Sequence, residues 1–156
     1  MSEEMLNELD IDYFRSAFNK YTREAFIKLP KMDKPRILDI GCGTGVPTME
    51  LAKLSDGEII GIDIDQKCLD RFNKKIEKEG LANRVKAIKC TLLDIKFPDN
   101  SFDVIWAEGT LTTLGVEKSL IEWKIVDTNS LNTSQCRKMH GGKNIINRSR
   151  VDSKYF

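Results

Sequence analysis

Apolar positions recur with two different spacings along the first 124 residues of the chain. Steps of three and four predict an amphipathic helix over residues 12–29, which Pro30 ends. The inward-facing positions of this helix are expected to be Phe14, Ala17, Phe18, Tyr21, Ala25 and Leu29. Short uninterrupted apolar runs predict four buried strands, at residues 36–40, 58–63, 84–90 and 102–107.

Helical signals separate these strands. Pro47 suits the first turn of a helix after the first strand, and Asp65 is expected to cap the next helix, which ends before Gly80. A fourth helix is predicted over residues 116–124. The inward positions of the helix after Asp65 are expected to be Leu69, Phe72 and Ile76. Alternating strands and helices predict an α/β fold, a Rossmann-like parallel sheet with helices on both faces.

The character of the chain changes after Lys124. Residues 125–156 hold six basic residues against two acidic ones and show no apolar period, although the whole chain carries a formal charge of only +1. We therefore expect a Rossmann-like domain over residues 1–124, with the helix 12–29 included, and a polar basic tail over 125–156. The tail lacks interleaved aromatic residues before its end, so we expect no nucleic-acid partner.

Composition favours a cytoplasmic protein. The four cysteines lie far apart without a CxxC pair, which is typical of reduced intracellular thiols. No apolar stretch approaches the ~18 residues of a membrane span, and the acidic N-terminus is unlike a secretory signal. Cys136 and His140 are too few to bind zinc, so we expect no metal.

Three glycines, Gly41, Gly43 and Gly45, lie between the first strand and the helix at Pro47. A backbone this bare lets a ligand lie against the main chain, and the helix N-terminus attracts an anion. Two classes of nucleotide ligand are compatible with such a loop. The dinucleotide fingerprint GxGxxG needs glycine at position 46, where this chain has Val46, so a nicotinamide-linked oxidoreductase is disfavoured.

The GxGxG order, within LDIGCGTG at residues 38–45, is similar to the first motif of class I S-adenosylmethionine-dependent methyltransferases. GIDID at 61–65 resembles their second-strand end, and FPDNSFDVIWAEG at 97–109 resembles the turn and fourth strand of the small-molecule branch. The resemblance covers residues 36–124. It implies S-adenosylmethionine as cofactor and direct methyl transfer from its sulfonium to a small-molecule acceptor.

The resemblance also implies which residues bind the cofactor. The loop residues Gly41, Cys42, Gly43 and Gly45 would lie against the methionyl part, with Asp39 beneath its amino group. Asp63 would accept the ribose hydroxyls, or be only a solvated strand-end acid. Ile64 would lie on the adenine face or merely pack.

The third motif departs from the family pattern, because Thr91 stands where an aspartate usually binds the adenine amino group. The Thr91 hydroxyl and the Leu92 N–H can still reach the ring, and Asp94 is a weaker candidate. Ala107 would offer a backbone carbonyl, and Glu108 is a base, a binding group or an ordinary strand-end carboxylate. The sequence identifies no catalytic residue, since a base is needed only if the acceptor must lose a proton.

The family normally has seven strands, and a turn like LKPGG follows its fourth helix. This chain reads WKIVDTNSLNTSQ there, so only four strands are predicted and the strand 102–107 is left with an open edge. Three explanations remain: a truncated or frame-shifted product, a divergent C-terminus that supplies strands, or an oligomer or partner chain that covers the edge. The function is therefore a small-molecule methyltransferase, or a cofactor-binding module or inactive truncated fragment without its own acceptor site.

Overall fold

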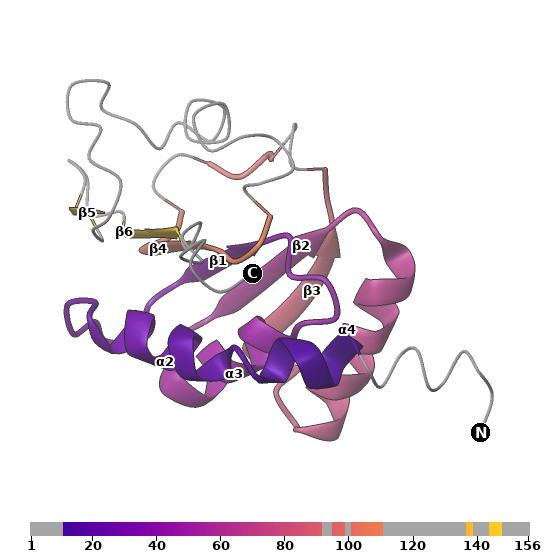
Figure 1. The fold of residues 1–156 in the computed structure, drawn as a ribbon. Helices are drawn as coiled ribbons and strands as arrows, with labels where there is room; N and C mark the ends of the chain where they lie inside the picture. The colour runs from indigo at the N-terminus through magenta and orange to yellow at the C-terminus, as the bar shows by residue number, and fades with distance from the viewer. Residues whose placement is uncertain (1–10, 92–94, 99–100, 111–136, 139–143, 148–156) are drawn as a thin grey trace.

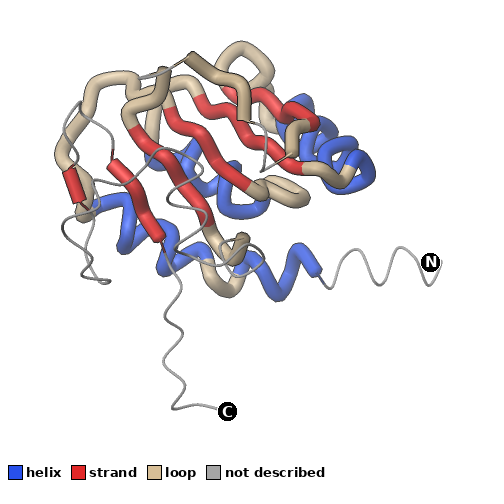
Figure 2. The backbone as a smooth tube through the Cα atoms, turned by 90° about the horizontal axis from the view of Figure 1, so that it is seen from above, coloured by secondary structure: helices blue, strands red, loops and turns tan. Residues whose placement is uncertain are grey.

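A computed structural model describes residues 11–91, 95–98, 101–110, 137–138 and 144–147. Their strands form one sheet in the order β3-β2-β1-β4-β6-β5 (Figure 1). The bounds are β1 Ile37–Ile40, β2 Ile59–Asp63, β3 Val85–Lys89, β4 Val104–Ala107, β5 Arg137–Lys138 and β6 Asn144–Asn147. All pairings are parallel except that of β5 with β6, and Figure 2 shows the strands side by side from above. The predicted parallel sheet is confirmed.

The order of the strands determines where a ligand can bind. From β1 the chain goes outward through β2 to β3, and β4 then pairs on the opposite side of β1. The connections after β1 and β4 therefore lead away in opposite directions at the carboxyl end of the sheet. In open α/β sheets this switch point is where ligands bind.

Three helices, α2 Asn19–Ile27, α3 Val46–Leu54 and α4 Gln66–Lys78, lie along the same face of the sheet (Figure 1). Pro47 is in the first turn of α3, and the Asp65 side chain caps α4 by accepting from the N–H groups of Lys67 and Cys68, as predicted. Gly80 follows α4 with a positive φ of 66°. Among the described residues, no helix combines the length and apolar character needed to cross a bilayer.

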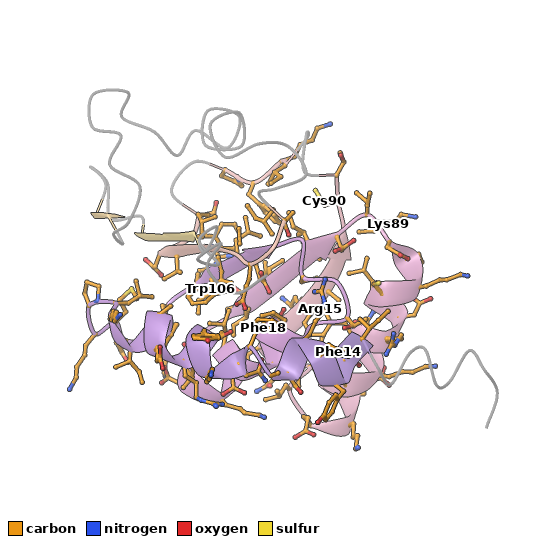
Figure 3. The ribbon with its side chains drawn as sticks, in the orientation of Figure 1. Phe14, Arg15, Phe18, Lys89, Cys90 and Trp106 are labelled. Atoms are coloured by element: carbon orange, nitrogen blue, oxygen red, sulfur yellow. The ribbon has the colours of Figure 1, made fainter. Side chains whose placement is uncertain are left out.

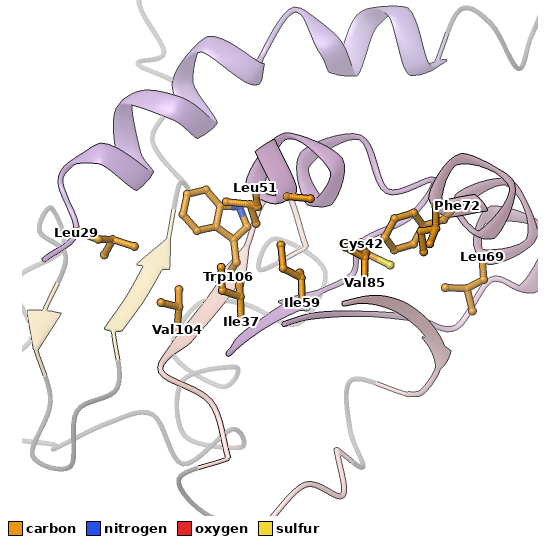
Figure 4. Packing of buried hydrophobic residues seen from close by; sticks show 12 residues of the cluster. Leu29, Ile37, Cys42, Leu51, Ile59, Leu69, Phe72, Val85, Val104 and Trp106 are labelled. Atoms are coloured by element: carbon orange, nitrogen blue, oxygen red, sulfur yellow. The ribbon is translucent and has the colours of Figure 1, made fainter. Parts of the chain in front are cut away.

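Alternating strand residues form two hydrophobic cores. On the helix-covered face, Ile37, Ile59, Val104 and Trp106 pack against Leu51 and Phe72 of the helices (Figure 4). The predicted inward residues of α4 are all buried there: Leu69, Phe72 and Ile76. On the opposite face, Leu38, Ile60 and Ile105 pack with Phe102, beside the partly buried Phe97. The predicted helix 116–124 lies outside the described residues.

The predicted helix 12–29 is broken. Residues 11–16 are helical, residues 17–18 form a turn, and α2 begins at Asn19. Phe14 and Phe18, expected inside, are 67% and 48% exposed, whereas Thr22 is 1% exposed and Leu29 is buried as expected. Residues 11–18 are called the N-terminal segment below. The inward face predicted for this part of the helix was wrong, because the segment lies over the loop that follows β1 rather than over the hydrophobic face of the sheet.

The open edge predicted beside β4 is also wrong. Residues 104–107 of β4 pair in register with residues 144–147 of β6, and β5 pairs with the far side of β6. The two additional strands come from within residues 125–156, as expected for a C-terminal segment that supplies strands itself. An isolated Ile-Ile pair among polar residues was too weak a pattern to predict β6.

Candidate functional site

The loop after β1 is pinned to the end of β2. The N–H groups of Gly41 and Cys42 both donate to the carbonyl of Ile62, at 2.8 and 3.0 Å. Gly41, Gly43 and Gly45 have φ values of 73°, 53° and 78°, in the left-handed region that favours glycine. The three glycines therefore let the chain turn sharply from β1 into α3.

Two of these glycines also have no room for a side chain. A Cβ on Gly45 would lie 2.0 Å from the ring of Phe72, and one on Gly41 would lie 2.0 Å from Oγ1 of Thr110. Phe72 belongs to the hydrophobic core and Thr110 follows β4, so the loop is held closely between α4 and the end of β4. Both neighbours therefore require a residue without a side chain at these two positions of the loop.

The Asp63 carboxylate joins the loop to the start of α4. Its Oδ2 accepts from the N–H of Gly43 at 2.8 Å, and its Oδ1 accepts from the N–H of Asp65 at 2.9 Å. Each oxygen keeps a second lone pair for a further donor. Ile64 follows directly and is 62% exposed, so an apolar surface lies next to this acid at the carboxyl end of β2.

Asp39 is a buried acid on β1. It is 1% exposed, and its Oδ2 accepts a hydrogen bond from Thr48 Oγ1 of α3 at 2.5 Å. Burial raises the pKa of Asp39 to about 7; the Thr48 bond opposes this effect and the negative charge of Glu108 adds to it. An acid in this environment is ready to bind a cation, because a positive charge would compensate its burial.

Glu108 follows β4, and two donors orient its carboxylate. Oε2 accepts from Thr22 Oγ1 at 2.9 Å and from Trp106 Nε1 at 3.3 Å. Trp106 is also the register partner of Asp39, which brings the two acids to neighbouring strand ends. Thr22 was not among the residues predicted from the sequence; a usable signal was its position four residues before Phe26, which packs against the core.

The predicted residues of the loop and of the strand ends come together in space. Asp39, Gly41, Gly43, Asp63 and Glu108 surround the carboxyl ends of β1, β2 and β4. Besides burial, the negative charges of Glu108 and Asp63 both raise the pKa of Asp39. Three carboxylates therefore gather around one glycine loop.

Other predicted residues offer only their main chain, or lie farther out. The Cys42 side chain is buried among core residues, where burial raises the pKa of its thiol far above the ordinary value. Ala107 is buried at the end of β4. Thr91 is exposed just past β3, where the N–H of the preceding Cys90 donates to the Asp63 carbonyl at 3.0 Å. Leu92 and Asp94 lie outside the described residues.

Asp12 fastens the N-terminal segment to the site. Its Oδ1 accepts from Thr44 Oγ1 of the loop at 2.6 Å, and its Oδ2 forms ion pairs with Arg71 at 3.0 Å and Lys75 at 2.7 Å. Although burial raises the pKa of Asp12, hydrogen bonds from Lys75 and Thr44 and the charges of the two bases hold it below its usual value. No local sequence pattern indicates this contact, which spans 59 residues between Asp12 and Arg71.

Known proteins with similar sequences are methyltransferases. The family model described as a methyltransferase domain matches residues 37–124, which include the loop, both strand-end acids and β4. The chain is 36% identical over 72 residues to a sterol 24-C-methyltransferase of Aspergillus fumigatus, covering 46% of this chain and 19% of that protein. It is 38% identical over 83 residues to the 27-O-demethylrifamycin SV methyltransferase of Amycolatopsis mediterranei, covering 53% of this chain and 30% of that protein.

Solved structures show the same fold. A SAM-dependent methyltransferase from Aquifex aeolicus superposes with a TM-score of 0.59 at 27% identity, covering 67% of this chain and 57% of that one. A putative S-adenosylmethionine-dependent methyltransferase from Methanococcus maripaludis gives a TM-score of 0.67 at 22% identity, with coverage of 79% and 57%. The chain spans less than a third of the length of the two relatives described above.

Proposed function

The chain belongs to the class I S-adenosylmethionine-dependent methyltransferases, and from that premise we propose that it binds S-adenosylmethionine and methylates a small molecule. One observation carries the proposal: a loop of three positive-φ glycines lies between the strand-end acids Asp39 and Asp63. The two acids lie near the carboxyl ends of two neighbouring strands, β1 and β2, at the switch point of the sheet. They are therefore suited to the two polar ends of an elongated ligand.

The residues of the site fit this cofactor. Asp63 has lone pairs available for two ribose hydroxyls, and the exposed Ile64 beside it offers an apolar surface to the adenine. The bare main chain at Gly41 and Gly43 admits the methionyl part. Asp39, buried and with a raised pKa, would hold the cationic amino group, and Glu108 adds negative charge nearby.

The adenine amino group has candidate partners at the neighbouring strand ends. Thr91 would offer its hydroxyl, Leu92 its N–H, and Ala107 its carbonyl. Support comes from Thr91 being exposed beside the end of β2 and from Ala107 ending β4. Cys42 would contribute main chain only, because its side chain is buried.

When bound, S-adenosylmethionine supplies a methyl group already activated by its sulfonium. The task left for the chain is to hold an acceptor in line with that group and to exclude water. Glu108 is the candidate for holding the acceptor, because Thr22 and Trp106 orient its carboxylate by donating to Oε2. Its Oε1, which has no hydrogen bond to a described residue, would accept a hydrogen bond or a proton from the acceptor.

An acceptor with substantial apolar surface fits the N-terminal segment. Tyr13, Phe14 and Phe18 are exposed on this segment, which the hydrogen bond between Thr44 and Asp12 joins to the glycine loop. The named activities of two relatives, on a sterol and on a demethylrifamycin, agree with an organic acceptor of this kind.

The cytoplasm is the proposed compartment, supported by the free cysteines Cys42, Cys68 and Cys90.

The test combines binding with turnover. The chain is incubated with methyl-labelled S-adenosylmethionine and a panel of sterols, polyketides and terpenoids, and label transfer and S-adenosylhomocysteine release are followed. Transfer to one class, reduced in Glu108→Gln, supports the proposal. Tight binding of S-adenosylhomocysteine without transfer to any acceptor supports a cofactor-binding module instead, and absence of binding overturns both.

A further inference from the structure

Glu108 keeps one carboxylate oxygen without a protein partner. Its Oε2 accepts from Thr22 at 2.9 Å and from Trp106 at 3.3 Å, whereas its Oε1 forms no hydrogen bond or ion pair with a described residue. The residue is half-buried and follows Ala107, the last residue of β4. Two neutral donors thus fix the direction of the carboxylate, while its negative charge has no counter-charge in contact with it among the described residues.

The charges around the glycine loop are mostly negative. Those that act most on Asp39 come from two acids, Glu108 and Asp63, and from one base, Arg15. The guanidinium of Arg15 lies beside the loop, because a Cβ added to Gly43 would be 3.1 Å from its Nη1. Three carboxylates therefore face one guanidinium at this end of the sheet.

The cofactor leaves the charge of Glu108 for the acceptor. In the proposed function Asp39 holds the ammonium of S-adenosylmethionine and Asp63 its ribose hydroxyls. A half-buried carboxylate is costly without a counter-charge. A cationic acceptor supplies that charge at Glu108, a neutral hydroxyl supplies only a hydrogen bond, and an anionic acceptor is repelled.

We propose that the methyl acceptor is an amine, held by its ammonium against Oε1 of Glu108. The inference rests on the proposed function, since it names the acceptor class of the same site. Phe18 offers a surface to the apolar part of such an amine. It is 48% exposed and lies one helical turn before Thr22, whose N–H donates to the Phe18 carbonyl at 3.3 Å. Figure 3 shows Phe18 on the helix-covered side of the sheet, where Trp106 also lies.

Methyl transfer to this amine balances with Glu108 as the proton acceptor. Oε1 takes one proton from the ammonium, which frees the lone pair of the nitrogen. The nitrogen forms a bond to the methyl carbon as the bond between that carbon and sulfur breaks, and the electron pair of the broken bond stays on sulfur. The N-methylated amine takes over the positive charge of the sulfonium, and S-adenosylhomocysteine is the second product. The proton on Glu108 passes to water after the products leave.

The test uses pairs of acceptors that share one carbon skeleton and differ only in an amino or a hydroxyl group. The pairs are tryptamine with tryptophol, geranylamine with geraniol, and cholestanylamine with cholestanol. Each compound is incubated with the chain and methyl-labelled S-adenosylmethionine, and kcat/KM for label transfer is measured. We expect N-methylation of at least one amine with a kcat/KM about tenfold or more above that of its alcohol, as for one charge-assisted bond.

Three variants separate the charge of Glu108 from general effects. Glu108→Gln keeps an oxygen for Thr22 and Trp106 but removes the charge, so it should raise the KM of the preferred amine about 10- to 100-fold and abolish the preference over the alcohol. Glu108→Asp retains the charge and should retain the preference. Glu24→Gln removes an exposed acid of α2 and should behave as the wild type does. Thermal melting of each variant shows whether it is folded.

The outcomes distinguish the acceptor class from the proposed function. If label reaches alcohols or other acceptors at least as well as amines, or if Glu108→Gln leaves the ratio of amine to alcohol unchanged, the amine inference is overturned and the proposed function stands. If the folded wild type binds S-adenosylhomocysteine but methylates no acceptor, only the cofactor site stands and the amine inference fails. If it binds no S-adenosylhomocysteine, the proposed function fails and the inference fails with it.

Discussion

The hydroxyl of Thr22 donates to Oε2 of Glu108 across 2.9 Å, joining helix α2 to the end of β4 over a sequence separation of 86 residues. Thr22 is fully buried at this contact, and Trp106 donates to the same oxygen. Phe26, one helical turn farther along α2, lies beside the ring of Trp106 with 6.3 Å between ring centroids. The contact therefore fixes both the helix and a carboxylate of the candidate site.

Replacing Thr22 by valine should destabilise the protein by about 1–3 kcal/mol, because Glu108 loses a donor at a partly buried site. Thr22→Ser keeps the hydroxyl and should lose less of this stability. Urea unfolding measures both. In a Glu108→Ala background the cost of Thr22→Val should shrink; an unchanged cost would show that the two side chains are not coupled.

Asp39→Asn should stabilise the protein at alkaline pH. Burial raises the folded-state pKa of Asp39 from 3.8 to about 7, so the folded state binds a proton more tightly than the unfolded state. The contribution of protonated Asp39 to the free energy of unfolding is complete below pH ~4 and is lost as the pH rises to about 7. Asparagine avoids this loss, which amounts to at most about 4 kcal/mol. Urea unfolding at pH 4.5 and pH 8 should show a much larger advantage of the variant at pH 8; equal differences at the two pH values would contradict this prediction.

Affinity for S-adenosylhomocysteine should rise with pH around neutrality. The ammonium of the ligand needs Asp39 ionised, and with a pKa of about 7 the ionised fraction grows about tenfold from pH 6 to pH 8. Burial is the main cause of this raised pKa; the Thr48 hydrogen bond and the Arg15 charge oppose it, and the charges of Glu108 and Asp63 add to it. The dissociation constant should fall by up to about tenfold over this range in the wild type. Asp39→Asn should bind weakly and without this slope, and a slope retained in the variant would assign it to another group.

Gly45→Ala should be strongly destabilising. The left-handed φ of 78° and a Cβ only 2.0 Å from the Phe72 ring act together, and we expect a loss of about 3 kcal/mol or more. Gly80→Ala is a matched control, because Gly80 has a similar φ of 66° but no atom within 4 Å of an added Cβ. It should cost only about 1–2 kcal/mol. Equal shifts in melting temperature would show that the contact with Phe72 is not limiting.

The sequence predicted the elements whose signals are local. The apolar runs of β1 and β2, the cap at Asp65 and the glycine triplet each depend on a few adjacent residues, and the structure has them in the expected places. The side chains around the site depend on contacts between distant segments. Arg15 over Gly43, Asp12 against α4 and Thr22 on Glu108 join residues at least 28 positions apart, so no periodic pattern indicates them. The break after Ser16 was missed because its residues keep a helical spacing across the turn.

We claim that the glycine loop and Asp63 bind the adenosyl cofactor together. The most direct test is isothermal titration of S-adenosylhomocysteine into the wild type and into Asp63→Asn, which keeps an oxygen for the Gly43 N–H but loses the negative charge. We predict saturable one-to-one binding to the wild type and markedly weaker binding to the variant. No binding to the folded wild type, or equal affinity in both proteins, would contradict the claim.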